Sequence, residues 1–294
     1  MSDKEIDQAS GVETTGHEWD GIKELNNPLP RWWLWTFYAC IVFSIGYIIW
    51  YPAIPLWEGS TMGISGTTNR GILSQELKAV EEGRRATVEK LANTDLETIR
   101  ADADLSRFAS AGGSSLFKVY CTQCHGSGAS GSPGYPNLND DDWLWGGDLE
   151  SIYTTIKHGV RSDIDDDTRD SLMPAFGADE LLEGDQVAAI TEYVLQISDN
   201  EFDATLAEAG REMFAENCAS CHGADGKGDR EFGAPNLADA IALYGSDRTS
   251  LKTQIHKPKH GVMPPWGDKL TEAGVKQLAI YVHGLGGGEK AKAE

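Results

Sequence analysis

The sequence predicts a mainly α-helical chain in which one membrane-spanning helix near the N-terminus is followed by two related small domains. Three observations lead to this prediction: an early stretch without charge, two copies of the pentapeptide pattern CxxCH, and repetition of the residues around those copies. The stretch without charge has the composition of a membrane helix, and the repeated motifs indicate duplicated domains.

The uncharged stretch extends from Trp32 to Trp57. Its first 20 residues, up to Tyr51, would form a helix of about 30 Å, which is the thickness of a bilayer's hydrocarbon core. Tryptophan and tyrosine gather at both ends of the stretch, as expected at the two membrane interfaces. Because 31 mostly polar residues precede it and no small-residue cleavage site follows closely, we expect a retained anchor and not a cleaved signal.

The connector after the anchor is predicted to be partly helical. Leu73, Leu77 and Val80 recur at helical spacing, and Thr94-Asp95 is a plausible cap for a second short helix. Cys40, within the anchor, is interpreted as a small apolar filler.

The two CxxCH motifs predict two covalently bound heme c groups. In this pattern two thiols bond the vinyl groups of the porphyrin, and the adjacent histidine takes one axial position on the iron. A thioredoxin-like redox pair or a zinc site needs no histidine directly after the second cysteine. The residues are Cys121, Cys124 and His125 in CTQCH, and Cys218, Cys221 and His222 in CASCH.

The surroundings of the motifs repeat as well. The cysteines lie 97 positions apart and the Pro-Asn-Leu that trails each motif lies 99 positions apart. Each copy then continues through a Met-Pro loop into a helical pattern, which is the layout of a small class I cytochrome c. The predicted organisation is a tail (1–31), an anchor (32–57), a connector (58–107), two tandem cytochrome c domains (108–198 and 199–288) and a C-terminal tail (289–294).

Met173 and Met263 are the candidates for the second axial position, because both lie in matched Met-Pro loops and thioether ligation suits a high-potential electron carrier. Ligation within each domain, His125 with Met173 and His222 with Met263, is the simplest topology. An exchange of the methionine loops between the two domains stays open.

The other histidines are rival ligands that we interpret differently. His158 and His260 hold equivalent places before the methionines, and we expect them to pack or form hydrogen bonds near the heme edge. His256 and His283 have no counterpart in the other copy. Pro136 and Pro235 are expected either to shape the loop on the histidine side of each heme or to form simple turns.

Residues 161–172, RSDIDDDTRDSL, form an insert that the second copy lacks. The insert is either a solvated loop or a docking surface for a basic partner. Residues 112–198 contain 15 acidic and 4 basic residues, against 11 and 9 in residues 203–288, which keeps the docking interpretation open. The net charge of −21 argues against nucleic acid as a partner.

Several segments together resemble one family. The motif GYPNLNDDDWLWGG from Gly134 to Gly147, the entry NNPLPRWW, the anchor ending YPAIPLW and the two heme motifs are similar to the diheme subunit III, CcoP or FixP, of cbb3-type cytochrome c oxidases. The similarity covers residues 20–57 and 108–288. The acidic insert departs from the family pattern.

The resemblance implies an electron-transfer subunit that is not catalytic on its own. Such a subunit accepts electrons from a soluble or membrane-bound cytochrome c or the bc1 complex. It passes them to a monoheme c subunit and on to the catalytic heme-copper subunit, where oxygen reduction is coupled to proton pumping. Because c-type heme is attached outside the bacterial cytoplasmic membrane, we expect a single-pass inner-membrane protein with a cytoplasmic N-terminus and periplasmic heme domains. The alternatives are a free-standing diheme shuttle, a dehydrogenase cytochrome subunit and a diheme peroxidase.

Overall fold

The computed structural model describes residues 5–290, and the chain divides into two compact units, one up to Gly83 and one from Arg84 onward. The division falls inside helix α2 (Asn69–Ala92). Helices are the main regular structure of the described chain, and its two sheets are short two-stranded hairpins. The predicted mainly α-helical class is confirmed.

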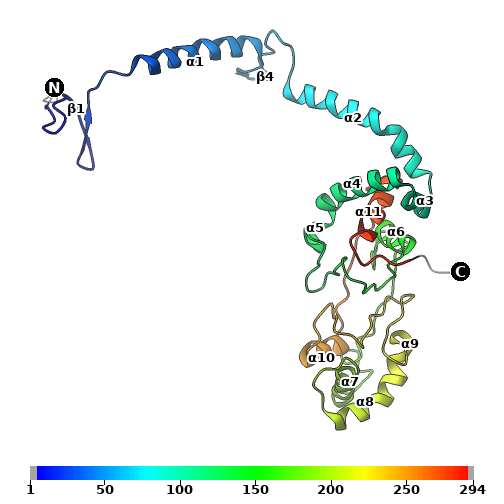
Figure 1. The fold of residues 1–294 in the computed structure, drawn as a ribbon. Coiled ribbons are helices and arrows are strands. Elements are labelled where there is room, and N and C mark those ends of the chain that lie inside the picture. The colour runs from blue at the N-terminus through cyan, green and yellow to red at the C-terminus, as the bar shows by residue number, and fades with distance from the viewer. Residues whose placement is uncertain (1–4, 291–294) are drawn as a thin grey trace. The chain divides into compact units, whose positions relative to one another are not determined.

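The first unit begins with an antiparallel hairpin of β1 (Thr14–Trp19) and β2 (Ile22–Leu25) (Figure 1). Trp19 pairs with Ile22, so Asp20 and Gly21 form a two-residue turn. Both turn residues have positive φ angles, as hairpin turns of this length require.

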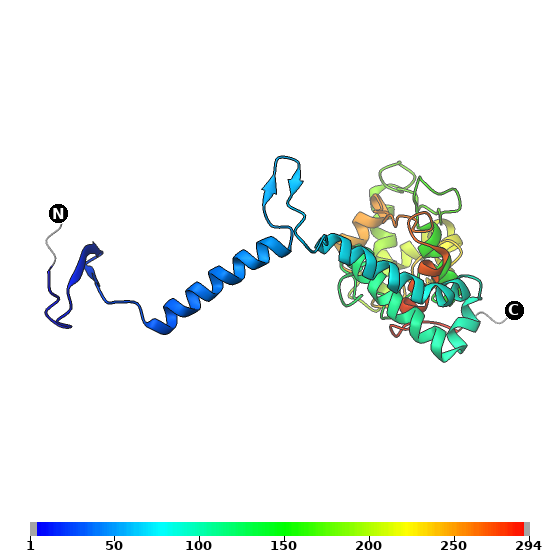
Figure 2. The ribbon, with the colours of Figure 1, turned by 90° about the horizontal axis from the view of Figure 1, so that it is seen from above.

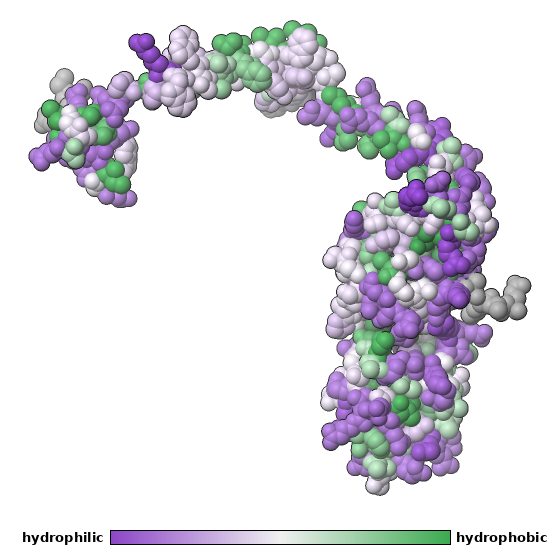
Figure 3. Space-filling view, viewed as in Figure 1, coloured by the Kyte–Doolittle hydropathy of each residue, from purple (hydrophilic) through white to green (hydrophobic). Residues whose placement is uncertain are grey.

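Helix α1 (Arg31–Trp50) is the only helix of the described residues that is long and apolar enough to cross a membrane. None of its residues is buried within the protein, and Figure 3 shows pale and green colours along it, with strong purple only at its start. The helix ends one residue earlier than predicted. Tyr51 is already extended, because a residue before a proline disfavours the α conformation.

A second hairpin and two helices follow α1 before the helix that leads into the first CxxCH motif. Strands β3 (Pro55–Leu56) and β4 (Gly59–Ser60) form a second hairpin, and α2 is followed by the short helix α3 (Leu96–Ala101). The predicted cap of that helix is confirmed, since the Asp95 side chain accepts a hydrogen bond from the Thr98 backbone N–H at 2.8 Å.

The second unit repeats one pattern of helices twice. A long helix leads into each CxxCH motif, and a single helical turn carries the motif's histidine. A helix after the motif and a helix after the Met-Pro loop complete each repeat. The helices are α4 (Ala103–Tyr120), α5 (Thr122–His125), α6 (Leu149–His158) and α7 (Gly184–Ile197) in the first repeat, and α8 (Ala204–Asn217), α9 (Ala219–His222), α10 (Arg248–His256) and α11 (Glu272–His283) in the second.

The last helices of the two repeats are exchanged in space. Helix α11, from the second repeat, packs on α4 and α6 of the first, whereas α7, from the first repeat, packs on α8 and α10 of the second (Figure 1). Two separate hydrophobic cores result. The first core contains Phe117, Ile152 and Leu278, and the second contains Phe214, Ile255 and Ile190.

The exchange happens where two extended segments cross. The Val160 and Met263 backbones form an antiparallel bridge, with N–H donating to C=O in both directions at 2.9 and 3.0 Å. Beyond this crossing, each segment enters the core that contains the other repeat's heme motif. The second core is therefore built from one continuous stretch between Met173 and His256, which interrupts the first core.

Equivalent glycines allow the closest helix contacts in the two cores. Gly113 on α4 lies against α11, where an added Cβ would be 2.1 Å from the Gln277 carbonyl oxygen. Gly210 on α8 lies against α7, where an added Cβ would be 2.1 Å from the Ala189 carbonyl oxygen. Since the partner atoms are backbone, neither contact can be relieved by a side-chain rotation.

We therefore expect Gly113→Ala and Gly210→Ala each to lower the free energy of unfolding of the heme-loaded subunit by about 2 kcal/mol through overpacking. Gly83→Ala in α2 is the matched control, because its added Cβ meets nothing within 4 Å. The control should be neutral or stabilising by up to about 1 kcal/mol. Urea unfolding followed by circular dichroism measures all three, and equal effects at the three positions would contradict this account of the helix contacts.

Candidate heme-binding sites

Each motif histidine is held by a proline carbonyl from the loop that follows it. The Nδ1 of His125 lies 3.0 Å from the Pro136 carbonyl oxygen, and the Nδ1 of His222 lies 3.1 Å from that of Pro235. A carbonyl oxygen only accepts hydrogen bonds, so Nδ1 carries the proton in both residues. The Nε2 lone pair is left available, which is the arrangement expected of a metal-binding imidazole.

Burial keeps both imidazoles neutral. The pKa of His125 and the pKa of His222 are lowered because burial disfavours the charged ring, and this outweighs the raising effect of the proline carbonyls. A neutral imidazole is the form that binds a metal. The structure thus supports the interpretation of Pro136 and Pro235 as residues that shape the histidine side of each site.

One cysteine of each motif packs in a core, Cys121 in the first and Cys218 in the second. Cys218 is buried, Cys121 and Cys221 are partly buried, and Cys124 is exposed. Burial raises the pKa of the Cys121 and Cys218 thiols to about 11. A dithiol redox pair depends on a lowered thiol pKa, so this environment does not match one. The set of thiols and a neutral histidine fits covalent heme attachment.

Each Met-Pro loop packs in the core that contains the CxxCH motif of the other repeat. The simplest topology would have placed it in the core of its own repeat. Met263 packs against the first core, which also contains Cys121, and Met173 packs against the second core, which also contains Cys218. The structure thus brings Met263 together with the CTQCH motif and Met173 together with the CASCH motif. The packing of the two methionine loops is therefore exchanged between the repeats.

Backbone hydrogen bonds hold the exchanged loops in place. In the first core, the N–H of Trp266 donates to the Ile156 carbonyl at 3.1 Å, and the Trp266 ring lies 5.2 Å from that of Tyr120. In the second core, the N–H of Ala178 donates to the His256 carbonyl at 2.9 Å. Each loop is thus attached to the helix that follows the other repeat's motif.

His158 and His260 form hydrogen bonds, as expected from the sequence. The Nε2 of His260 accepts a hydrogen bond from the Met173 backbone N–H at 3.1 Å, so this residue supports the exchanged methionine loop. His158 contacts the Asp165 carboxylate at 3.1 Å. Folding also brings a ligand atom of Asp167 within 4.8 Å of both, a grouping that spacing along the sequence did not predict.

The insert 161–172 is attached to the crossing by its two arginines. Arg161 donates to the Gly261 and Ser171 carbonyl oxygens, both at 3.0 Å. Arg169 donates to the Thr155 hydroxyl oxygen at 3.0 Å, and its guanidinium lies over the Trp145 ring. The exposed acidic side chains face solvent: Asp163, Asp166, Asp167 and Asp170.

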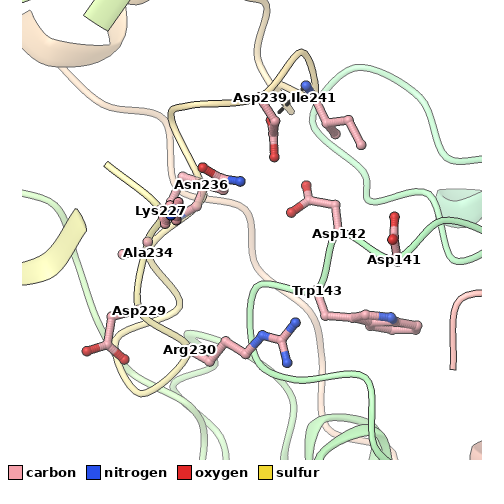
Figure 4. A pocket seen from close by; sticks show the side chains of 12 residues that line it. Asp141, Asp142, Trp143, Lys227, Asp229, Arg230, Ala234, Asn236, Asp239 and Ile241 are labelled. Atoms are coloured by element: carbon pink, nitrogen blue, oxygen red, sulfur yellow. Dashed lines mark hydrogen bonds between the residues drawn. The ribbon is translucent and has the colours of Figure 1, made fainter. Parts of the chain in front are cut away.

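A polar cavity of about 480 Å³ lies where the loops of the two repeats meet (Figure 4). One wall is formed by residues 141–143 of the first repeat and the other by residues between 227 and 241 of the second, including Pro235. Figure 4 shows the Asp142 carboxylate near that of Asp239, with the Arg230 guanidinium on another side of the cavity. Arg230 is already paired with Glu289.

The cavity shifts the titration of Asp142. Burial raises the pKa of this carboxyl group to about 6, with further raising by Asp239, Asp140 and Asp141 and a smaller lowering by Arg230. The folded protein therefore binds this proton more tightly than the unfolded chain, whose pKa is near the ordinary value of 3.8.

Sequence reasoning missed several residues that build the sites. The signal for Gly113 and Gly210 was available, because they are separated by the same 97 positions as the motif cysteines. The C-terminal contacts carried no such signal. The Trp143 indole donates to the Gly287 carbonyl at 2.7 Å, and only the folded chain brings these distant segments together.

Because Asp142 binds a proton more tightly when folded, stability should fall as pH rises from about 4 to about 6. We expect Asp142→Asn to match the parent at pH 4 and to exceed it at pH 7.5. The gain should be about 1 kcal/mol, less than the full shift implies because the carboxyl is partly exposed. Urea unfolding at the two pH values tests this, with Asp166→Asn as an exposed control. If the free energies of unfolding of parent and variant differed by the same amount at both pH values, the raised pKa assigned to Asp142 would be wrong.

Two family models match the chain. The N-terminal domain of FixP from cbb3 cytochrome oxidase matches residues 11–58, and subunit III of cbb3-type cytochrome c oxidase matches residues 109–194 and 205–282. The second model thus matches once around each CxxCH motif, in agreement with the predicted duplication.

Curated relatives are similar over nearly the whole chain. A subunit named CcoP of the cbb3-type oxidase from Cereibacter sphaeroides is 53% identical, covering 98% of this chain and 100% of its own. A subunit named FixP from Sinorhizobium medicae is 52% identical, covering 97% and 98%. A CcoP subunit from Azospirillum brasilense is 46% identical, covering 98% and 100%.

Proposed function

The chain belongs to the subunit III family, CcoP or FixP, of cbb3-type cytochrome c oxidases, and from this premise we propose that it carries electrons into the oxidase through two heme c groups. Electrons would come from a donor cytochrome c or the bc1 complex. They would leave to the monoheme c subunit and reach the catalytic heme-copper subunit, where oxygen reduction is coupled to proton pumping. The observation that carries the proposal is that each core brings a cysteine of a CxxCH motif together with a methionine of a Met-Pro loop, Cys121 with Met263 and Cys218 with Met173.

The residues that would hold the hemes follow from the fit of each core. Cys121 and Cys124 would bond one macrocycle and Cys218 and Cys221 the other, and heme c, when bound, supplies an iron that exchanges single electrons. His125 and His222 would each present Nε2 to the iron. Their proline-bonded Nδ1 atoms fix the tautomer and the ring orientation, which keeps the ligand in place in both oxidation states.

We propose that the second axial ligands are exchanged between the repeats. Met263 would complete the site of His125, and Met173 would complete the site of His222. The support is the packing of each methionine in the core of the other repeat's motif, together with the backbone bridge at Val160 and Met263. With both axial positions filled by protein, no substrate needs to bind iron, which favours a carrier over a peroxidase.

The donor and the membrane arrangement are proposed from charge and from cofactor chemistry. The exposed aspartates of the insert would favour encounter with a basic donor, an effect that acts mainly on the association rate. The protein would be a single-pass protein of the bacterial inner membrane, anchored by α1. Its N-terminus would be cytoplasmic and its cytochrome domains periplasmic, where c-type heme is attached.

Loss of one heme attachment site should interrupt the electron route. We expect the oxidase complex carrying Cys218→Ala and Cys221→Ala to consume oxygen about tenfold or more slowly than the parent with a reduced donor cytochrome c, because one redox centre is missing. Cys40→Ser is the matched control, since Cys40 lies in α1 outside both motifs, and should keep the parent rate. Oxygen uptake by the purified complex measures both.

Three further measurements bear on the proposal: the salt dependence of the parent rate, co-purification and peroxide turnover. The parent rate should fall with increasing salt if a basic donor meets the acidic insert. A chain that never co-purifies with a heme-copper oxidase would instead support the free-standing shuttle or the dehydrogenase subunit. Peroxide turnover by the isolated chain would support the peroxidase.

The methionine exchange is tested in chains that keep one motif. With only CTQCH retained, Met263→Ala should give a high-spin heme that binds carbon monoxide, whereas Met173→Ala should not. With only CASCH retained, the two results should be reversed. In the intact chain, nuclear Overhauser contacts should connect the Met263 methyl group with the heme attached at Cys121. Contacts to the heme at Cys218 would overturn the exchange even if the single-motif chains fold poorly.

A further inference from the structure

The segment directly after α1 folds back onto the end of that helix. The Ile64 N–H donates to the Ile49 carbonyl at 3.0 Å, and the Ser65 N–H donates to the Trp50 carbonyl at 2.9 Å. Gly63 makes this return possible, because it has a φ of +65° and an added Cβ would be 2.5 Å from the Trp50 carbonyl oxygen. Residues 51–65, called here the return hairpin, are thereby fixed to the helix end (Figure 2).

These hydrogen bonds have a specific value in a bilayer. The last carbonyl groups of any helix lack partners within the helix and normally bind water or a cap. Where water is scarce, an unpaired carbonyl costs several kcal/mol. The return hairpin supplies N–H partners to Ile49 and Trp50, so this end of α1 can lie in a poorly hydrated layer.

The outer surface of the return hairpin is apolar. Trp57 at its turn is fully exposed, and other large apolar side chains along it are also exposed. Glu58 is the single charged residue among its 15 residues, and the segment contains no lysine or arginine. The exposed apolar set comprises Ile54, Leu56, Trp57, Met62 and Ile64.

We infer that the return hairpin lies in the boundary between headgroups and acyl chains of the leaflet at the C-terminal end of α1, with Trp57 as its anchor. The occupant of this surface is the lipid, because the hairpin is continuous with the membrane helix and bonded to its last turn. Tryptophan favours this layer because its ring is apolar and its N–H is polar. The absence of cationic residues indicates that binding relies on apolar insertion and not on attraction to anionic headgroups.

This inference gives the hairpin a function that an anchor helix alone does not perform. A single helix can slide and tilt to match the bilayer. An apolar segment bonded at one end of the helix adds a second membrane contact at a defined depth. The hairpin would therefore set the depth of α1.

The test uses the full-length chain in nanodiscs of zwitterionic lipid, with Cys40→Ser to remove the free thiol. A nitroxide is placed on Leu56→Cys, which keeps the Trp57 anchor, and its access to oxygen and to a water-soluble nickel chelate is measured by power saturation. Phe43→Cys in α1 and Ile22→Cys in the N-terminal hairpin serve as membrane and aqueous references. Position 56 should favour oxygen over nickel, with a value between the two references.

Two results would overturn the inference. Access to nickel equal to that of the Ile22 position would place the hairpin in water. Protection from both reagents in the full oxidase complex would identify a protein partner as the occupant.

The same probe at Ile48 tests the effect on depth: replacing Leu56 and Trp57 with serine should change its oxygen-to-nickel ratio, whereas Glu58→Gln should not. An unchanged ratio in the serine variant would show that the hairpin does not set the depth of α1.

Discussion

The crossing of two extended segments at Val160 and Met263 determines how the whole cytochrome region is built. Before the crossing, each repeat contributes a leading helix, a CxxCH turn and a following helix to its own core. Beyond it, each repeat gives its Met-Pro loop and last helix to the other core. Neither repeat alone holds a complete core, so the two cytochrome folds depend on each other.

The exchange costs little because the repeats are similar. An exchanged element makes the contacts that its equivalent would have made, as in domain swapping between identical chains. The equivalent glycines Gly113 and Gly210 illustrate this, since each receives a helix of the other repeat at the same close distance. The first core is interrupted by a long segment that forms the second core. The entropic cost of bringing the two parts of the first core together grows only slowly with the length of that segment.

How much the sequence could predict depends on whether a feature is local. Helix α1 and the Asp95 cap are each specified by a few neighbouring residues, and the pattern of those residues was sufficient to predict them. The assignment of Met173 and Met263 to cores was not local. Either loop can complete either core when both repeats present similar surfaces, so no residue pattern distinguishes the two arrangements.

The nested arrangement also explains why an unfavourable carboxyl group lies between the cores. Asp142 comes from the loop of the first core and faces Asp239 from the second, and these loops meet in one cavity. Burying such a group costs free energy that a surface position would avoid. The C-terminal segment is held to the first core by the Trp143 indole, and its Glu289 pairs with Arg230 from the loop of the second core, so one ion pair crosses the same junction. A movement that separates the two cores would have to break this ion pair, and the backbone bridge between Val160 and Met263 opposes the same movement, so both contacts limit the motion of one core relative to the other.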